Sequence, residues 1–435
     1  MTENKSRQMK PSGVPWLGDI PEGWDTLFLV QLAAQVKNRN SDLAETNLLS
    51  LSYGKIKRKD IDSPDGLLPA SFDGYNIIEK GDVVLRLTDL QNDQTSLRVG
   101  RSEERGIITS AYTTVHPRNA DFAPYLFYAL NAFDLAKGFY GMGSGVRQGL
   151  NWSEVKRLRV PFPPLPEQRA IADFLDEKCA AIDAIVEEAK SGIEEYAKWK
   201  QSVVFQAVTK GLDPHAKMKD SGVEWIGDIP EKWEVMPIKH IVNLLAGFAF
   251  KSEEFEMSEG VRLLRGINVG VNGLRWDECV FWNKPVGEEL AGYQIHKGDL
   301  IVGLDRPWIS EGTRVCFATD DDLPCLLVQR VCRIRSLGKT DLRIIKHWLA
   351  SNAFEQALSC ETTGISVPHI SPRQILEFRI AFPPLPEQRA IADYLDEKCS
   401  AIDALIEEKK QLIEDLGVYK KSLIYETVTG KRKIA

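Results

Sequence analysis

The chain has 435 residues, of which 43% are hydrophobic and 27% charged, and a formal net charge of −7. This length predicts two cores with connecting segments, and the composition is typical of a globular protein. Every apolar run is shorter than the ~18 residues that a membrane-spanning helix needs, which argues against an integral membrane protein.

The N-terminal segment MTENKSRQMKPSG lacks the apolar core of a secretion signal. Seven cysteines without a C-x-x-C pair argue against a zinc ribbon, and their odd number suits a reducing compartment. The six histidines are scattered and form no pattern of metal ligands. We therefore expect a cytoplasmic protein without a metal site, in which Cys179 and Cys399 are small core residues.

Two sequence motifs occur twice. The arm-start motif KPSGVPWLGDIPEGW (Lys10 to Trp24) returns as KDSGVEWIGDIPEKW (Lys219 to Trp233), with 11 of 15 residues identical. The joint motif (Phe162 to Glu188) returns 220 positions later, with 23 of 27 residues identical. The residues between the motifs do not visibly match. The repeats divide the chain into arm one (1–160), joint one (161–212), arm two (213–380) and joint two (381–435).

Both arms are predicted to be mixed α/β. In arm one, β-rich runs lie at Asn47–Tyr53, Asp82–Leu87 and Thr109–His116, and a helix is predicted over Pro124–Lys137. In arm two, β-rich runs lie at Asp299–Leu304 and Cys325–Arg335, and a helix is predicted over Arg343–Leu358. A Lys-Gly-Asp triplet at 80–82 and again at 297–299 predicts a turn in each arm.

Each joint predicts one long helix of ~40 residues, or roughly 60 Å. Prolines make its start stiff, Pro166 suits the first helical position, and Gly211 suits the end of the first helix. Apolar or long side chains then recur in steps of three and four, as in a heptad seam. In joint one they are Ile171, Leu175, Lys178, Ile182, Val186, Ala189, Ile193, Tyr196, Lys200, Val203 and Ala207, and joint two repeats them from Ile391 to Leu423.

A long helix with one apolar stripe needs a partner for that stripe. The simplest partner is the other joint, which would give an antiparallel coiled coil with pseudo-two-fold symmetry that holds the arms at opposite ends. The alternative is that each helix packs only on its own arm.

Acidic residues concentrate in the joints. The segment Glu167–Glu195 carries −6 and the segment Glu387–Asp415 carries −5, so the rest of the chain carries +4. Such segregation lets acidic helices face solvent or a protein while basic arms face phosphate. It permits nucleic-acid binding without proving it.

Two segments resemble cofactor-binding motifs of enzymes, but each lacks a feature that the motif requires. Phe139–Gly143 matches the F-x-G-x-G pattern of S-adenosylmethionine-dependent methyltransferases, but it follows a helical stretch and no acid stands ~20 residues downstream. Gly338-Lys339-Thr340 resembles the end of a phosphate loop, but Arg333 stands where the first glycine is required. We therefore expect no catalytic residues in this chain.

The repeated P-P-L-P-E-Q-R-A-I-A-D-x-L-D followed by a long helix, with W-x-G-D-I-P-E-x-W ahead of each arm, resembles the specificity subunit of type I restriction–modification enzymes. The resemblance covers essentially the whole chain. It implies a non-catalytic subunit whose arms are target recognition domains, each reading one half of a bipartite, asymmetric site in double-stranded DNA.

The resemblance also implies partners. The helices would act as a spacer and dock two modification subunits, which bring S-adenosylmethionine and methylate adenine. Restriction subunits, when present, would add ATP and Mg²⁺ for translocation and cleavage. Two arms on one face of a duplex would place the half-sites about one helical turn apart, near 34 Å.

Side chains that can read base edges or hold phosphates lie in both arms. Arg reads guanine, Asn and Gln read adenine, Ser and Thr read either base, and Lys and Arg position the backbone. In arm one the predicted DNA contacts are Tyr53, Lys55, Lys57, Arg58, Lys59, Arg86, Thr88, Gln91, Ser144, Arg147, Gln148 and Asn151. In arm two they are Arg306, Trp308, Arg314, Gln329, Thr362, Thr363, Ser366 and His369. For the basic run at 55–59 a solvated surface turn is the alternative.

The repeated tryptophans (Trp16 and Trp225, Trp24 and Trp233) are predicted to pack where each arm begins. At the helix starts, the identical Glu-Gln-Arg triplets suggest a required surface for a partner or for the other helix. These residues are Glu167, Gln168, Arg169, Glu387, Gln388 and Arg389.

Two other functions stay open. One is a coiled-coil scaffold that joins two protein partners without binding DNA, which the absence of salt-sensitive duplex binding would favour. The other is a self-contained methyltransferase, which would have to bind S-adenosylmethionine by itself.

Overall fold

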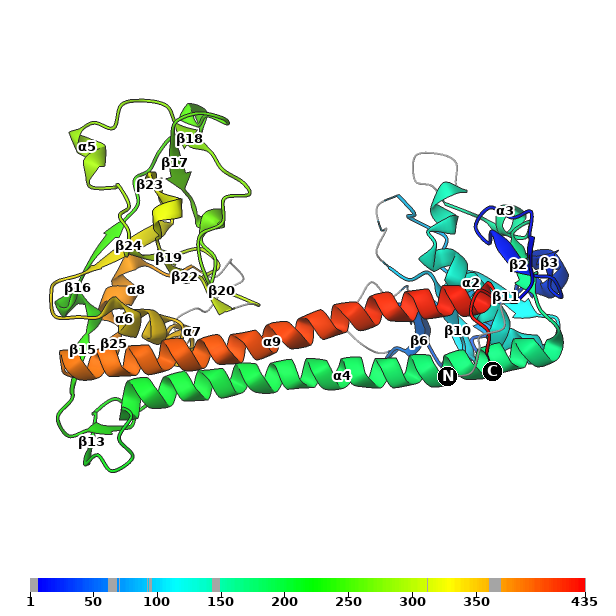
Figure 1. Ribbon diagram of the computed structural model, residues 1–435, viewed down its shortest axis with the longest axis horizontal. Helices are drawn as coiled ribbons and strands as arrows, with labels where there is room; N and C mark the ends of the chain where they lie inside the picture. The colour runs from blue at the N-terminus through cyan, green and yellow to red at the C-terminus, as the bar shows by residue number, and fades with distance from the viewer. Residues whose placement is uncertain are drawn as a thin grey trace. The chain divides into compact units, whose positions relative to one another are not determined.

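A computed structural model describes residues 7–61, 69, 71–91, 93, 96–142, 149–310, 312–359 and 369–434. The chain forms two compact units (Figure 1). Unit 1 comprises Met1–Lys190 and Lys410–Ala435, and unit 2 comprises Ser191–Lys409. Each unit therefore combines one arm with part of each long helix. Within the described ranges, every helix is too short or too polar to cross a lipid bilayer.

The joints form the two long helices that the sequence predicts. Helix α4 covers Leu165–Lys210 (46 residues) and helix α9 covers Leu385–Val428 (44 residues). Gly211 follows α4 with φ of +74°, a conformation that glycine adopts without strain, and this ends the helix as predicted.

In unit 1, the first part of α4 runs antiparallel to the last part of α9. Leu175 and Ile182 of α4 share a core with Leu423 and Val428 of α9. Further along α4, the Asp183 carboxylate accepts a hydrogen bond of 2.5 Å from Lys420. A fully buried leucine contributes about 1.5–3 kcal/mol, so the seam is a main source of stability here.

In unit 2, the last part of α4 runs antiparallel to the first part of α9. Ala207 shares a core with Leu395, and Lys200 Nζ lies 2.6 Å from Asp403 Oδ2. This ion pair and the Lys420–Asp183 pair join the same repeat positions, 220 residues apart. The predicted antiparallel pairing and the internal pseudo-symmetry are therefore confirmed within each unit. Lys178 is an exception to the predicted seam, since it is exposed and its neighbour Cys179 is buried.

The central sheet of unit 1 is antiparallel, in the order β4-β11-β8-β9. Helix α2 (Ala123–Leu135) contacts β8 and β9. The sheet strands are β4 (Ala33–Gln35), β8 (Val83–Leu85), β9 (Val99–Arg101) and β11 (Thr113–Pro117). The other elements are β1 (Met9–Pro11) with β2 (Asp19–Pro21), β3 (Asp25–Phe28) with β12 (Arg159–Phe162), β5 (Leu49–Ser52) with β6 (Lys55–Arg58), β7 (Asn76–Ile78) with β10 (Gly106–Ile108), and the short helices α1 (Leu29–Leu32) and α3 (Trp152–Val155).

The central sheet of unit 2 has the same pattern, antiparallel in the order β16-β24-β19-β22. Its strands are β16 (Val242–Ala246), β19 (Leu300–Gly303), β22 (Val315–Phe317) and β24 (Val331–Ser336). The other elements are β13 (Met218–Asp220) with β14 (Asp228–Pro230), β15 (Glu234–Pro237) with β25 (Arg379–Phe382), β20 (Trp308–Ile309) with β21 (Gly312–Thr313), β17 (Val261–Leu264) with β18 (Phe281–Trp282) and β23 (Cys325–Leu327), and helices α5 (Glu288–Ala291), α6 (Leu342–Leu349), α7 (Asn352–Ser359) and α8 (Pro372–Glu377).

Three predicted elements need correction. The run Cys325–Arg335 is two strands, β23 and β24, because Arg330 adopts a left-handed conformation (φ +67°) between them. The helix predicted over Arg343–Leu358 is two helices, α6 and α7, and the Ser351 hydroxyl between them donates to the Trp348 carbonyl (2.6 Å). The strand predicted from Thr109 begins only at Thr113. The Lys-Gly-Asp turns are confirmed, since Gly81 and Gly298 both have positive φ.

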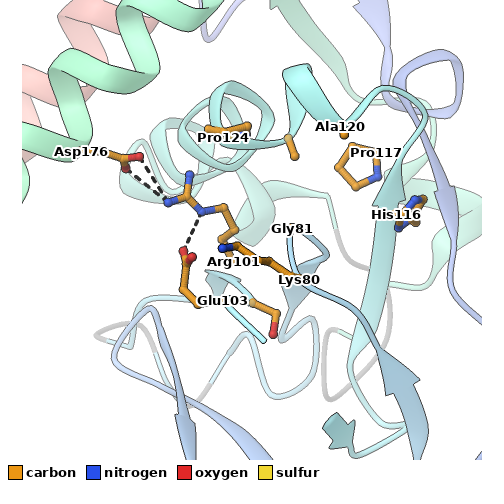
Figure 2. Close-up of a pocket in the computed structure, with 11 residues that line it drawn as sticks. Lys80, Gly81, Arg101, Glu103, His116, Pro117, Ala120, Pro124 and Asp176 are labelled. Carbon is orange, nitrogen blue, oxygen red and sulfur yellow. Dashed lines mark hydrogen bonds and ion pairs between the residues drawn. The ribbon is translucent and has the colours of Figure 1, made fainter. Parts of the chain in front are cut away.

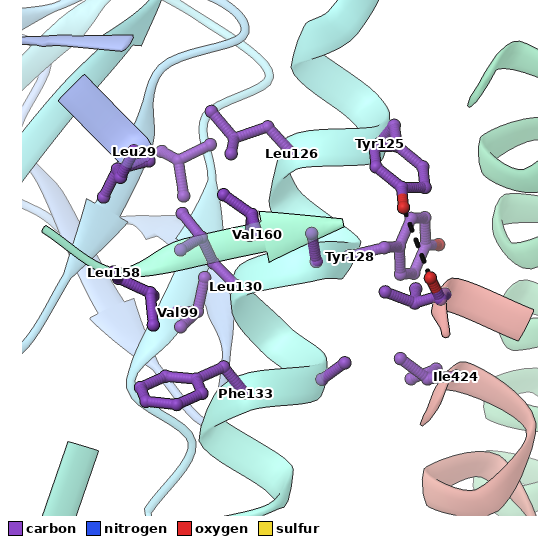
Figure 3. Close-up of a cluster of buried hydrophobic side chains, with 14 of the residues drawn as sticks. Leu29, Val99, Tyr125, Leu126, Tyr128, Leu130, Phe133, Leu158, Val160 and Ile424 are labelled. Carbon is purple, nitrogen blue, oxygen red and sulfur yellow. Dashed lines mark hydrogen bonds between the residues drawn. The ribbon is translucent and has the colours of Figure 1, made fainter. Parts of the chain in front are cut away.

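The core of unit 1 joins the arm to the long helices. Figure 3 shows α2 between strand residues such as Val160 and the end of α9, where the Tyr125 hydroxyl donates to the Val428 carbonyl at 3.3 Å. Two of the repeated tryptophans, Trp24 and Trp233, lie where each arm meets a long helix, since they bond Glu167 and Glu387. Trp24 and Trp233 are 1% and 0% exposed, which confirms that they pack in the core.

Candidate nucleic-acid interface

The hairpin of β5 and β6 carries the basic run predicted to contact DNA. Its turn begins at Tyr53, which has φ of +48° and a side chain that is 80% exposed. The leucines of β5 point into the unit, since alternate residues of a strand face opposite sides. Lys57 and Lys59 are exposed. The basic run is thus mostly a strand on the surface.

Two basic side chains of this hairpin already have acidic partners. Lys55 Nζ lies 2.7 Å from Asp183 Oδ2 on α4, and Arg58 binds Glu104. Although burial raises the pKa of Asp183, hydrogen bonds from Lys420 and Lys55 bring it below its ordinary value. The hairpin is therefore linked to both long helices through one carboxylate, and Lys57 and Lys59 are the cations best placed for phosphate.

The loop after β8 brings together three more predicted contacts. We call Arg86–Gln91 the first loop. Thr88 and Gln91 are exposed, and Arg86 is half-buried with Nη1 3.4 Å from Asp93 Oδ2. Beneath the loop, the buried Arg98 donates its backbone N–H to Asp134 Oδ2 at 2.6 Å. The first loop therefore presents hydroxyl and amide groups above a buried layer of polar side chains.

The stability of this region should depend on pH through Asp134. Burial raises its pKa from 3.8 to about 6. Between about pH 4 and 6 the folded chain therefore binds a proton that the unfolded chain has released. Proton binding by Asp134 thus stabilises the folded chain at low pH, and this stabilisation is lost as the pH rises through 6. We expect the free energy of unfolding of the native chain, relative to Asp134→Asn, to fall by roughly 3 kcal/mol over this window. Urea denaturation across the pH series measures it, and parallel curves for the two proteins would contradict it.

In unit 2 a second group of predicted contacts surrounds Asp305. Its carboxylate oxygens lie 2.7 Å from Arg330 Nη1 and 2.7 Å from His369 Nδ1. Arg306, the next residue, is exposed and has φ of +43°, and Gln329 beside Arg330 is exposed too. The fold thus gathers Arg306, Gln329 and His369 although the first and the last are 63 positions apart in the sequence.

Arg330 belongs to this group but sequence reasoning missed it. It lies within the run predicted as one strand, but it adopts a left-handed conformation between β23 and β24 and belongs to neither strand. Burial raises the pKa of Asp305, but the hydrogen bonds from Arg330 and His369 outweigh this and lower it overall. The Arg330 side chain is 67% exposed, so it remains accessible to a phosphate or a base.

Trp308 and Arg314 have different surroundings from those predicted. Trp308 lies on β20, half-buried, with its ring 6.2 Å from that of Phe354. Arg314 Nε donates to the Val269 carbonyl (2.8 Å) and Nη1 to the Asp305 carbonyl (2.9 Å). These bonds use Nε and Nη1 of Arg314 within its own arm. A base edge would have to compete with the two carbonyls for the same donors.

The loops before the joints are described only at their ends. Ser144, Arg147, Gln148, Thr362, Thr363 and Ser366 lie outside the described residues. Asn151 caps α3, where its side chain accepts from the Ser153 N–H at 2.8 Å. This bond occupies the Asn151 carbonyl oxygen and leaves its amide nitrogen for other partners.

The Glu-Gln-Arg triplets at the helix starts divide by position. Glu167 and Glu387 accept hydrogen bonds from the indoles of Trp24 (2.7 Å) and Trp233 (2.9 Å). Gln168 and Gln388 are buried, with amides that donate to the Pro163 and Pro383 carbonyls. The remaining residues, Arg169 and Arg389, are exposed. Of each triplet, the arginine is therefore the side chain with most surface for a partner.

Unit 1 also has a pocket of about 420 Å³ beside α4 (Figure 2). Arg101 lies between Asp176 (3.3 Å) and Glu103 (3.0 Å), and Pro117, Ala120 and Pro124 line another side. None of the predicted DNA contacts within the described residues lines this pocket. In the same ranges, no group of three or more His, Cys, Asp or Glu side chains could hold a metal ion.

Comparison with known families gives a match over both arms. The model of the type I restriction modification DNA specificity domain matches residues 99–195 and 230–415. The MjaVIII specificity subunit of Methanocaldococcus jannaschii is 28% identical over 420 residues, covering 95% of this chain and 94% of that protein. The EcoAI specificity subunit of Escherichia coli is 32% identical over 231 residues, covering 52% of this chain and 38% of that protein.

Solved structures share the fold. A chain described in a study of complex assembly and conformational transition of the type I R-M system superimposes with a TM-score of 0.70 at 16% identity, covering 95% of this chain and 99% of that one. The HsdS subunit from Thermoanaerobacter tengcongensis gives a TM-score of 0.50 at 15% identity, covering 99% and 100%. At this identity the likeness shows the fold alone.

Proposed function

The chain belongs to the family of type I restriction–modification DNA specificity domains, and from this premise we propose that its two arms each read one half of a bipartite, asymmetric site in double-stranded DNA. The chain itself would be non-catalytic. It would direct adenine methylation by modification subunits that carry S-adenosylmethionine, and cleavage by restriction subunits with ATP and Mg²⁺ where these are present.

One observation carries this proposal. The two arms share the order of their central sheet, yet the loops on that sheet expose different side chains. The first loop exposes Thr88 and Gln91, whereas arm two exposes Arg306, Gln329 and Arg330. Hydroxyl, amide and guanidinium groups are the ones that discriminate base edges in the major groove. Equivalent scaffolds with different reading groups are what a two-part asymmetric site requires.

The long helices are proposed to dock two modification subunits. Several of their large apolar side chains are exposed, among them Trp199 (50%), Val418 (62%) and Tyr419 (48%). Aromatic side chains of this kind often anchor protein interfaces. Because the two helices have similar sequences and run antiparallel within each unit, they offer two similar surfaces, which supports two copies of one partner.

Duplex binding tests the DNA part of this proposal. The chain assembled with its modification subunits should bind its own methylation site more tightly than an unrelated duplex, and both affinities should fall steeply with salt as phosphate contacts are screened. Salt-independent binding, or none, would favour a protein scaffold that does not touch DNA.

The helices should also set the length of the unread spacer. Four residues inserted after Ala189 and four after Lys409 add roughly 6 Å to each helix where the two compact units divide. Since ten base pairs rise ~34 Å, we expect the spacer of the methylated site to lengthen by about one or two base pairs. Methylation-sensitive sequencing reads the spacer directly. The same four residues inserted after Asp213, outside both helices, are the control and should leave it unchanged, and an unchanged spacer in both proteins would refute the ruler role.

A further inference from the structure

The first loop of arm one has a structural counterpart in arm two, at the same distance from the repeated Lys-Gly-Asp triplet. The first loop follows β8, the third strand of its central sheet. We call Gly303–Trp308 the second loop, and it begins at the last residue of β19, the third strand of the sheet in arm two. Arg86 N donates to the Arg98 carbonyl at 2.9 Å, and Gly303 N donates to the Arg314 carbonyl at 3.0 Å. The register of the sheets thus makes Arg86 equivalent to Gly303.

The equivalence continues along both loops. Leu87 and Leu304 follow, and their carbonyls accept from Leu150 N and Ile370 N, both at 2.9 Å. Two residues later the chain turns through a left-handed residue in each arm, Asp89 (φ +59°) and Arg306 (φ +43°). The loop sequences, RLTDLQ and GLDRPW, share only the leucine, so the backbone path is kept while the side chains differ.

In each arm an arginine at the equivalent position donates hydrogen bonds to the backbone of the loop. Arg98 directly precedes β9, and Arg314 directly precedes β22, the strands that pair with β8 and β19. Arg98 Nη1 donates to the Thr88 carbonyl at 2.8 Å, and Arg314 Nη1 donates to the Asp305 carbonyl at 2.9 Å. Thr88 and Asp305 are equivalent residues, each immediately before the left-handed residue.

The remaining donors of Arg98 are also used inside its arm, and Arg314 Nε donates to the Val269 carbonyl. Arg98 Nη1 and Nη2 bond the Arg86 (3.1 Å) and Asp89 (3.2 Å) carbonyls, and Nε bonds the Tyr140 hydroxyl (3.0 Å). The Arg98 side chain is 0% exposed. A buried guanidinium is tolerated only when its donors are satisfied, so the loop carbonyls and Arg98 hold each other in one arrangement.

We propose that Arg98 and Arg314 are positioning residues for DNA reading, each holding the backbone of its loop so that the exposed side chains meet base edges in a fixed geometry. Direct readout needs this rigidity, because two hydrogen bonds to one base discriminate only when both groups are placed together. This inference rests on the proposed function and extends it, since each arginine would act through the loop that it holds.

Arg314 offers the cleaner test, because it is only half-buried and its loss should leave arm two folded. In the complex with modification subunits, Arg314→Gln should weaken binding to the native methylation site about tenfold to a hundredfold while leaving affinity for an unrelated duplex unchanged. Sequencing of methylated sites should show relaxed positions only in the half read by arm two. The thermal unfolding midpoint verifies that the variant is folded.

Two further variants separate positioning from general stability. Arg262→Gln is the matched control, because Arg262 is another half-buried arginine of unit 2 that donates to two backbone carbonyls, those of Asp321 and Leu323, away from the second loop. It should leave both half-sites unchanged. Tyr140→Phe removes one bond to Arg98 and should relax only the half read by arm one.

If folded Arg314→Gln reads both half-sites as sharply as the native chain, the positioning role is wrong. If its losses extend to both half-sites or equal those of Arg262→Gln, the arginine is only structural. If the native complex prefers no duplex sequence at all, the proposed function is wrong, and Arg98 and Arg314 then have no role in DNA reading.

Discussion

Replacing residues 25–155 with the corresponding arm of another specificity subunit is expected to change one half of the methylated site completely and leave the other half intact. The exchanged segment contains the hairpin of β5 and β6 and the first loop. It leaves Trp24, Glu167 and both long helices native, so the bond between the Trp24 indole and Glu167 is kept, whereas α2 and its contact with Val428 would come from the donor arm. Strand β3 would come from the other specificity subunit, whereas its partner strand β12 stays native. The two strands should still pair, because their four residue pairs are joined through backbone groups.

The reciprocal exchange provides the control. Replacing 234–377, from the start of β15 to the end of α8, should change only the other half of the site. Methylation-sensitive sequencing of cells that carry each chimaera and the modification subunits gives both half-sites at once. A change in both halves from one exchange, or in neither from both, would be incompatible with one arm reading each half-site.

Replacing Trp233 with alanine is expected to destabilise unit 2 by about 3–5 kcal/mol. The Trp233 ring is fully buried beside Gly211 at the end of α4, and its indole N–H donates to Glu387 at the start of α9. Its loss would leave a cavity and a carboxylate without its donor where the arm meets both helices. Native-state hydrogen exchange should show reduced protection within Ser191–Lys409.

The internal repeat supplies the matched variant for this experiment. Trp24 makes the same bond to Glu167 in unit 1, so Trp24→Ala should lower protection there and spare the other unit. Trp233→Phe should be milder than Trp233→Ala, because it keeps most of the apolar surface and loses only the indole bond. Equal loss of protection in both units from either alanine variant would show that the two junctions do not act separately.

The sequence predicted the elements whose signal is local. The joints became α4 and α9 because proline, an acidic first turn and a heptad seam act within a few residues of one another, and Gly211 ended α4 where a left-handed residue was needed. The strands at β5, β8 and β19 followed from short β-rich runs bounded by turn residues. The errors lie where one residue breaks a run, as Arg330 does between β23 and β24.

The candidate site was predicted only in part. Residue types suited to base reading were recognised along the chain, but Arg314 turned inward to backbone carbonyls and Arg330 was overlooked. Pattern and composition indicate what a side chain can bind. They do not indicate whether its donors are already taken by the fold, because that depends on contacts between residues distant in sequence.

Repeated local signals in this chain were enough to specify two long helices, two arms and the family to which they belong. The common sheet order of the arms, the matching hydrogen bonds of the first and second loops, and the arginines beneath them emerged only from the folded chain. The reason is physical: backbone hydrogen bonds define a strand's neighbours without regard to side-chain identity, so two halves can keep one scaffold after their sequences have ceased to resemble each other.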